Sequence, residues 1–547
     1  MKLLALEFCK CRRRKLTLVC AGLLAAQLLW FGAYLTRQDA EALAQGWMLL
    51  LYNLAMVDAI MLPIGVAVIA SRSCELEHRG HTLKLLETAV TPGRLYAAKL
   101  AWGALVLAGL LLAGLALFLF RFFSDGGHWA SSPFNRHLYN RDGALISGTV
   151  LDRNGTVLSY VDDNGDRRCA DGKTLRKATL HAAGDPQGNI GTGALTAFAR
   201  KLTGYSLLFG AYNAREGNDL YLTIDADLNE TAYQALDGRK GTVAVYNYKT
   251  GEVLCMVSSP SYDPKNIPDD LETNDKYQGV YLNRLLSSSF TPGSVFKTVT
   301  LAAALEKIPD LYSRTFYCEG SVEIGGETVT CTAAHGEQTI QDALANSCNV
   351  AFGQLAVELG ANTLEKYAGK AGLTKSYDVN GIPTAAGSVD LSGATDNDLA
   401  WAGVGQYHDS VNPCALMIYM GAIANGGKAV QPTLIQKVVS PGLPALPQFT
   451  HTTRRMIKAD TAQAMADMMA NNVSATYGTK RFSGMDLCAK SGTAEVGADQ
   501  KPHAWFTGFL RNEEAPYAFV VLVENGGGGS EVAGTVAAKV LKAALAS

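Results

Sequence analysis

A serine and a lysine three residues apart, Ser294 and Lys297, are the first residues whose types and spacing suggest covalent chemistry. The proline and glycine before Ser294 predict a turn, and residues 295–306 predict a helix. Residues three apart on a helix share a face, so the ammonium of Lys297 would lie beside the hydroxyl of Ser294. A serine hydroxyl attacks only when a neighbouring base takes its proton, and a lysine becomes such a base when burial or a second cation lowers its pKa.

A second short motif, Ser347-Cys348-Asn349, places a hydroxyl and an amide on either side of one residue. Both could face one cleft if Cys348 turns away from it. A purely structural alternative is that Asn346 or Ser347 caps the helix that follows.

A third motif, Lys490-Ser491-Gly492-Thr493, follows the apolar residues 487–489. This pattern predicts a buried strand that ends in one cation and two hydroxyls. Gly492 would let another stretch of backbone approach closely. The alternative is a lysine on an edge strand, followed by ordinary turn residues.

The order Ser-x-x-Lys, Ser-x-Asn, Lys-Ser-Gly is the signature of the penicillin-recognising serine enzymes. From about residue 141 to the end, the chain resembles a class B penicillin-binding protein, a peptidoglycan D,D-transpeptidase. Further agreement lies in GTVLDRNGTVL, LTIDADLNETAYQAL, KTGEVLCMVSSPSYDP, HGEQTIQDALANSCNVAF, GAIANGG and HAWFTGFL. The resemblance implies an α+β fold of the serine β-lactamase/transpeptidase type, with an antiparallel sheet flanked by helices and a small β-rich pedestal.

The resemblance also implies a role for each motif residue. Ser294 would attack the penultimate D-Ala of a peptidoglycan stem peptide, and a β-lactam antibiotic would acylate the same hydroxyl. The other implied site residues are a base, a proton relay, an amide that holds the substrate, a second cation and a carboxylate-binding strand: Lys297, Ser347, Asn349, Lys490, and Ser491 with Gly492 and Thr493. A membrane glycosyltransferase of the cell-wall machinery is the implied partner, and neither a cofactor nor a metal is implied.

Other functions remain to be separated from transpeptidation. A class A β-lactamase deacylates with a Glu in an E-x-x-L-N loop, and no Glu in this sequence begins that pattern, so a long-lived acyl-enzyme is expected. There is also no H-E-x-x-H zinc-protease motif and no phosphate-binding P-loop. The remaining alternatives are a slow D,D-carboxypeptidase, and a β-lactam sensor or permease-linked scaffold whose site is vestigial.

The composition divides the chain into two bodies. The 547 residues carry 48 basic and 50 acidic side chains, a net charge of −2 that excludes a dedicated nucleic-acid binder. The mean hydropathy is +0.06. Residues 1–125 hold 13 Lys/Arg and 8 Asp/Glu, whereas the remainder holds 35 and 42. A basic, apolar body therefore precedes an acidic one.

Three apolar stretches in the first body, residues 16–35, 47–70 and 100–120, are each long enough to cross a bilayer as a helix. Basic residues concentrate before the first stretch and between the second and third, which predicts that these segments are cytoplasmic. A bundle of three transmembrane helices would then place the amino terminus in the cytoplasm. The catalytic body would lie outside the plasma membrane.

Roughly the first 120 residues also resemble part of an ABC-2-type transporter permease, on the loop ELEHRGHTLKLLETAVTPGRLYAAKL. Such permeases usually have about six spans, so transport by this chain alone is not expected. Three domains are predicted: the membrane region 1–125, a linker and pedestal 126–235, and the transpeptidase domain 236–547. The turn-rich residues 124–133 would form the linker.

Eleven cysteines are present. Cys318 and Cys331 flank a predicted hairpin with a Gly325-Gly326 turn. A disulfide between them, free thiols, and a zinc site shared with His335 all stay open, and no fourth zinc ligand is evident from the sequence. Cys348 is expected to be only the small residue of its motif.

Overall fold

A computed structural model describes most of the chain beyond residue 89. Apart from six positions between 63 and 71, its described residues are 90–130, 146–203, 205–206, 210–211, 217–441, 450–497 and 499–546. The chain divides into two compact units, Met1–Gly126 and Gly127–Ser547.

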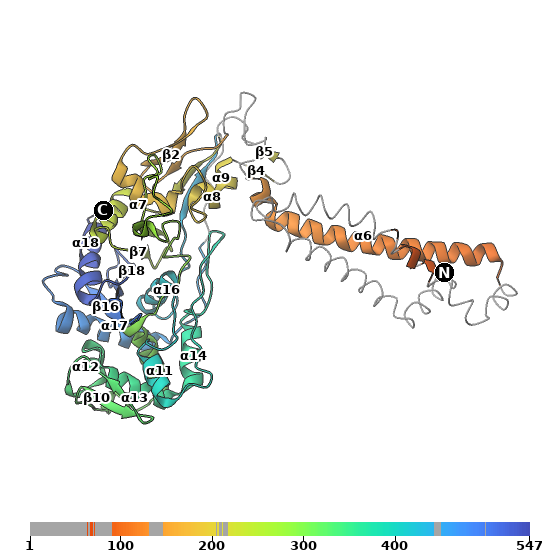
Figure 1. The fold of residues 1–547 in the computed structure, drawn as a ribbon. Coiled ribbons are helices and arrows are strands. Elements are labelled where there is room, and N and C mark those ends of the chain that lie inside the picture. Colours follow the sequence, from red (N-terminus) through yellow and green to blue (C-terminus); the bar gives the residue numbers. More distant parts are fainter. Residues whose placement is uncertain are drawn as a thin grey trace. The chain divides into compact units, whose positions relative to one another are not determined.

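The described part of the first unit is dominated by one helix, α6 (Pro92–Ala130), drawn in orange in Figure 1. It includes the third predicted span, 100–120. The first predicted span, and all but a few positions of the second, lie outside the described residues. Across the described segments, no helix is both long and apolar enough to cross a membrane, so the three-helix bundle stays a prediction. One expectation was wrong: residues 124–130 belong to α6 and are not a turn-rich linker.

A five-stranded antiparallel sheet, here called the main sheet, organises the second unit. Its strand order is β16-β17-β18-β7-β8. The strands are β7 (Gly241–Asn247), β8 (Val253–Ser259), β16 (Leu487–Ala494), β17 (His503–Leu510) and β18 (Tyr517–Val523). The α+β class with a helix-flanked antiparallel sheet is confirmed.

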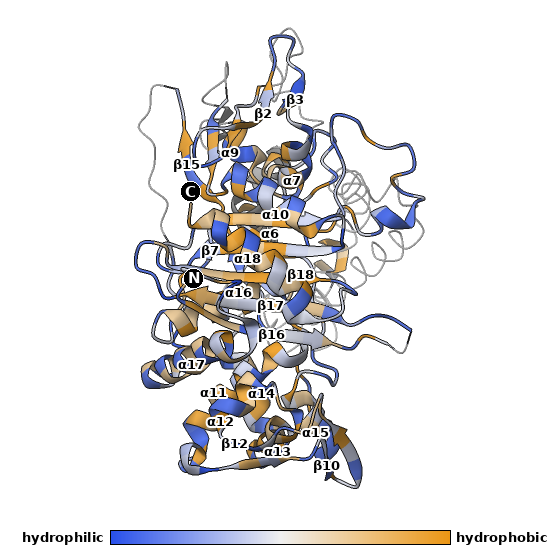
Figure 2. Ribbon diagram, turned by 90° about the vertical axis from the view of Figure 1, so that its left-hand side faces the viewer, coloured by the Kyte–Doolittle hydropathy of each residue, from blue (hydrophilic) through white to orange (hydrophobic). Residues whose placement is uncertain are grey.

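Both faces of the main sheet are buried. Along β18, Val520 and Leu522 enter one hydrophobic core, whereas Val521 and Val523 enter another. Successive side chains of a strand point to opposite faces of the sheet, and here both faces are buried. The sequences of these strands are therefore largely continuous apolar runs. Figure 2 shows hydrophobic residues gathered along these strands. The first core is closed by α11 (Lys297–Lys307), α16 (Pro413–Ala424) and α17 (Ala459–Asn472), and the second by α10 (Ala226–Leu236) and α18 (Gly534–Ala544).

A second five-stranded sheet, here called the small sheet, has the order β15-β6-β1-β2-β3. Asn154 and Gly155 lie in the turn between β1 and β2, and Gly155 has the positive φ of 93° that is typical of an Asn-Gly hairpin turn. β15 comes from more than 200 residues later in the chain and pairs antiparallel with β6. The strands are β1 (Val150–Leu151), β2 (Val157–Val161), β3 (Arg167–Cys169), β6 (Asp219–Leu222) and β15 (Ile435–Val439).

Helices and two pairs of short antiparallel strands form a third region around the Ser-Cys-Asn motif. A capping box between Thr339 and Asp342 starts α12 (Ile340–Ala345), and the motif forms the turn into α13 (Asn349–Leu359). Two further helices, α14 (Ala361–Lys370) and α15 (Asp396–Gly403), pack beside α13. The pairs are β9 (Phe316–Cys318) with β12 (Gly336–Gln338), and the hairpin of β10 (Ser321–Ile324) with β11 (Glu327–Thr330), which lies between them in the chain.

Candidate active site

Ser294 lies in a short 3₁₀ turn, η3 (Gly293–Phe296), that runs directly into α11. The turn needs glycine before the serine: Gly293 has a φ of 55°, and a Cβ atom there would lie 2.6 Å from the carbonyl oxygen of Thr493. Lys297 begins α11 and is fully buried. Its Nζ lies 3.1 Å from Ser294 Oγ, so the predicted shared face is confirmed.

Lys297 also reaches the second motif. Its Nζ donates to the carbonyl oxygen of Ser347 at 2.5 Å, to Ser347 Oγ at 3.1 Å and to Asn349 Oδ1 at 2.7 Å. No carboxylate is among its hydrogen-bond acceptors in the described structure. Burial lowers the pKa of Lys297 to about 7, because the charged ammonium loses its hydration.

The turn that carries Ser347 has an unusual backbone. Ser347 has a φ of 54°, a left-handed conformation that non-glycine residues rarely adopt. The helix α13 is capped by Cys348, whose Sγ accepts from the backbone N–H of Ala351 at 3.5 Å. The structural alternative for this motif was therefore wrong, since neither Asn346 nor Ser347 caps α13. Ser347 instead directs its hydroxyl toward Lys297.

The third motif forms the second half of β16, as expected of a buried strand that ends in Lys490 to Thr493. Lys490 is fully buried, and its Nζ donates to Ser347 Oγ at 3.0 Å and to the carbonyl oxygen of Ser491 at 2.9 Å. Burial first, and then the charge of Lys297, lower the pKa of Lys490 well below its usual value. The hydroxyl of Ser347 thus lies between two lysine amines, an arrangement suited to proton transfer.

The predicted close approach at Gly492 is present. A Cβ atom on Gly492 would lie 3.0 Å from the carbonyl oxygen of Pro292, so β16 lies directly against the turn that carries Ser294. Beyond it, Thr493 is exposed, and its Oγ1 accepts from the backbone N–H of Gly529 at 3.2 Å. The structure therefore brings all eight predicted site residues into one place.

Two supporting residues escaped prediction. The hydroxyl of Tyr477, at the end of the π-helical turn η5 (Val473–Tyr477), accepts the backbone N–H of Ser491 at 2.8 Å. The side chain of Gln406 donates to the carbonyl oxygen of Thr493 at 3.3 Å. Neither residue belongs to a motif, and both act on strand backbone, so no sequence pattern marks them.

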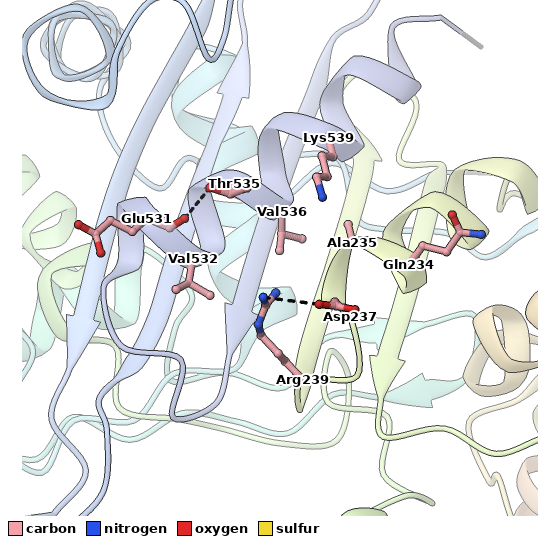
Figure 3. A pocket seen from close by; sticks show the side chains of 9 residues that line it. All are labelled: Gln234, Ala235, Asp237, Arg239, Glu531, Val532, Thr535, Val536 and Lys539. Atoms are coloured by element: carbon pink, nitrogen blue, oxygen red, sulfur yellow. Dashed lines mark hydrogen bonds and ion pairs between the residues drawn. The ribbon is translucent and has the colours of Figure 1, made fainter.

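A cavity of about 370 Å³ lies elsewhere, between α10 and the segment 531–539 (Figure 3). Its lining includes Arg239 beside Asp237, with Lys539 from α18 above them. None of its residues belongs to the three motifs. The chemistry is therefore assigned to the junction of η3, the Ser347 turn and β16.

Comparisons with known proteins agree with this geometry. The family model described as penicillin binding protein transpeptidase domain matches residues 241–545, and that of ABC-2 family transporter proteins matches residues 3–139. The chain is 30% identical over 386 residues to peptidoglycan D,D-transpeptidase PbpA of Mycolicibacterium smegmatis, covering 64% of this chain and 75% of that protein. It is 29% identical over 349 residues to stage V sporulation protein D of Bacillus subtilis, covering 60% and 53%.

Solved structures give the same fold. The D,D-transpeptidase domain of a peptidoglycan glycosyltransferase from Eggerthella lenta superposes with a TM-score of 0.63 at 27% identity, covering 73% of this chain and 98% of that one. Penicillin-binding protein A of M. tuberculosis, solved as a ceftriaxone acyl-enzyme, gives a TM-score of 0.64 at 24% identity, covering 75% and 99%. Because the transpeptidase model matches more than half of the chain, the chain belongs to the class B penicillin-binding proteins and is a serine-type D,D-transpeptidase.

Proposed function

We propose that this enzyme cross-links peptidoglycan stem peptides through an acyl-enzyme on Ser294. The observation that carries the assignment is the 3.1 Å separation between Ser294 Oγ and the buried Nζ of Lys297. With a pKa near 7, a large fraction of Lys297 is uncharged at neutral pH, and the free amine can accept the serine proton.

In the acylation step, the Ser294 hydroxyl gives its proton to Lys297 Nζ while Oγ attacks the carbonyl carbon of the penultimate D-Ala. The negative charge that forms on the carbonyl oxygen is stabilised by the backbone N–H groups of Ser294 and Thr493. Collapse breaks the peptide bond, and the departing amine of the terminal D-Ala takes up a proton through the Ser347 hydroxyl, which contacts both lysines.

The second half of the reaction reverses these proton transfers. An amine from a neighbouring stem peptide attacks the ester, its proton passes to the same lysine and serine groups, and Ser294 regains its hydrogen as the new amide forms. A β-lactam acylates the same hydroxyl, but its leaving group stays tethered to the adduct. The adduct is expected to be long-lived.

Substrate binding follows from the strand and the turn that flank Ser294. Ser491, Gly492 and Thr493 would bind the terminal carboxylate along β16, next to the positive potential of Lys490. Asn349 would hold a substrate amide while its own Oδ1 accepts from Lys297 at 2.7 Å.

Labelling with a fluorescent penicillin tests this assignment. The full-length chain should form a slowly released covalent adduct, Ser294→Ala should form none, and Ser289→Ala, an exposed serine in the preceding loop, should label like wild type. Failure of the wild type to label would sink the mechanism and favour a sensor or scaffold with a vestigial site. Rapid turnover of the penicillin would favour a lactamase, and release of D-Ala without cross-linking would favour a carboxypeptidase.

The location of the enzyme belongs to the same proposal. We infer that residues 1–125 anchor it in the plasma membrane with a cytoplasmic amino terminus, and that the pedestal 126–235 and transpeptidase domain 236–547 lie outside. The distribution of basic residues supports this orientation, and the ABC-2 family match supports the membrane anchor. A membrane glycosyltransferase would supply the glycan strands. Alkaline phosphatase fused after residue 547 should be active. If the phosphatase were active only when fused before residue 15, the orientation in the membrane would be the opposite of the one proposed.

A further inference from the structure

Three cysteines and one histidine meet behind the Ser347 turn. Cys318 ends β9, Cys331 follows β11, His335 precedes β12, and Cys348 caps α13. Each offers one ligand atom, and these four atoms all lie within 4.8 Å of one another. The fourth ligand that the sequence did not reveal is therefore Cys348.

The fold gathers these residues from three separate segments. β9 pairs with β12, with Cys318 opposite Gly336, which brings Cys318 beside His335. The backbone N–H of Cys331 donates to the carbonyl oxygen of Gly320 at 2.8 Å and so closes the β10–β11 hairpin over Cys318. Cys348 then reaches the group from the helical side.

The distances fit a tetrahedral metal and not a disulfide. Cys331 Sγ lies 3.9 Å from Cys348 Sγ and 3.6 Å from His335 Nδ1. Zinc–sulfur bonds of about 2.3 Å and zinc–nitrogen bonds of about 2.05 Å at tetrahedral angles give separations of about 3.8 Å and about 3.6 Å. A disulfide requires about 2.05 Å. None of the three cysteines forms a disulfide in the described structure.

The surroundings are suited to thiolates. The backbone N–H of Asn349 donates to Cys331 Sγ at 3.2 Å, and that of Ala351 donates to Cys348 Sγ at 3.5 Å. Such N–H donors are the groups that usually orient and stabilise metal-bound sulfur. Cys318 and Cys348 are fully buried, whereas Cys331 and His335 are partly exposed and leave a path for an ion to enter.

We propose that Cys318, Cys331, His335 and Cys348 bind one zinc ion. Four protein ligands close the coordination shell, so the ion is structural and not catalytic. On binding, three thiol protons pass to solvent, and one divalent cation replaces them among three thiolates and one neutral imidazole. Cys348 separates Ser347 from Asn349, so the ion would fix the strained turn that presents both residues to Lys297.

The test uses the full-length chain, purified without chelator and analysed by mass spectrometry of metals. One zinc per chain is expected, and replacement by cobalt should give the visible absorption of a tetrahedral thiolate site. Cys331→Ser and His335→Ala should each lower zinc affinity by at least about tenfold. Cys169→Ser, a partly exposed cysteine in β3, is the matched control and should keep the ion.

Four cysteines near the amino terminus could also hold metal, so they are removed in a second control. A chain carrying Cys9→Ser, Cys11→Ser, Cys20→Ser and Cys74→Ser should still bind one zinc. Loss of zinc from that chain, or its retention in both Cys331→Ser and His335→Ala, would overturn the proposal. So would a wild-type chain that holds no zinc, or one whose intact mass shows a disulfide among these cysteines.

If the variants of the zinc ligands fail to accumulate, measurements on the wild-type chain still test the zinc proposal. A thiol-specific mercurial should release zinc in step with modification of three cysteines. Chelation should reduce penicillin labelling while the helix content stays largely unchanged. Ser294→Ala separates the two proposals, because it should lose the penicillin label and keep its zinc.

Discussion

At the scale of single residues, the proposed mechanism depends on removing the charge from one lysine. Lys297 is fully buried, and its neighbours are hydroxyl, carbonyl and amide oxygens, none of which carries a negative charge. These oxygens orient the amine without stabilising the ammonium as a carboxylate would. Burial therefore determines the direction of the pKa shift.

The rate of β-lactam acylation should follow the deprotonation of Lys297. Below about pH 7 the ammonium cannot accept the serine proton, so the rate should rise with pH and level off above the pKa. Lys297→Arg keeps a cation that does not deprotonate, and we expect it to lower the acylation rate by about 10²–10⁴ at every pH. Stopped-flow acylation across the pH range measures both, and a flat wild-type profile would contradict the role of Lys297.

Asp409 is a second buried ionisable side chain, and its burial makes the stability of the folded protein depend on pH. It is 2% exposed, and neither carboxylate oxygen has a hydrogen-bond partner among the described residues. Burial raises the pKa of Asp409 to about 8, whereas an unfolded aspartate titrates at about 3.9. Because the folded protein disfavours the ionised carboxylate, the free energy of unfolding should be highest at low pH and should fall as pH rises from about 4 to about 8.

Replacing Asp409 should therefore stabilise the protein in a pH-dependent way. Near neutral pH, Asp409→Asn should have a free energy of unfolding higher than that of wild type by on the order of 3 kcal/mol, and it should unfold at a higher temperature. The difference in free energy should shrink toward about pH 5. Thermal unfolding at several pH values measures this. The exposed Asp499→Asn is the control, and a difference that is independent of pH would refute the explanation.

At the scale of elements, the success of prediction depended on how local the signal was. The helix predicted over residues 295–306 is present as the end of η3 followed by α11, because the turn residues before Ser294 and the helical residues after it are adjacent in the sequence. β15 was not foreseen, because its hydrogen-bonding partners lie more than 200 residues away. The position of Cys348 beside Cys318, Cys331 and His335 was also missed, since this cluster arises only when separate segments meet.

The Lys-Ser-Gly strand depends on an element that carries no motif. The turn η5 holds β16 through the hydroxyl of Tyr477, which accepts the backbone N–H of Ser491. Tyr477→Phe keeps the ring against Phe506, whose centroid lies 5.2 Å away, but leaves that N–H without its partner.

We expect Tyr477→Phe to lower the free energy of unfolding by about 1–3 kcal/mol and to slow acylation, because the strand proposed to bind the substrate carboxylate loses a hydrogen bond that holds it in place. Thermal unfolding and penicillin acylation rates measure the two effects. Tyr312→Phe removes the hydroxyl of an exposed tyrosine, 64% accessible, and should change neither. Wild-type acylation by Tyr477→Phe would show that the hydroxyl does not position the strand.

At the scale of the whole molecule, the second unit is held together by contacts between distant segments. Arg176 in α7 (Lys173–Ala183) forms a two-pronged ion pair with Asp263, with nitrogen–oxygen distances of 2.6 and 2.8 Å. Both side chains are 5% exposed. The pair joins α7, beside the small sheet, to the loop that follows β8 of the main sheet.

Breaking this pair should be costly because the remaining charge stays buried. Arg176→Ala should lower the free energy of unfolding by about 3–5 kcal/mol, whereas the double change Arg176→Met with Asp263→Leu should recover much of that loss. Thermal unfolding of the single and double variants measures this. Equal midpoints for wild type and Arg176→Ala would show that the pair contributes little.

The return of β15 to the small sheet also restricts how such a chain can be reassembled by recombination. β15 lies deep within the catalytic sequence, yet its hydrogen bonds go to β6, which precedes the main sheet. A recombination junction between β6 and β7 would therefore take β6 and β15 from different parent chains, and a mismatch between them would leave the edge of β6 without its hydrogen-bonding partner. An exchange of the amino-terminal body leaves the catalytic unit whole only if the junction falls before β1, so the small sheet and the main sheet must be inherited as one piece.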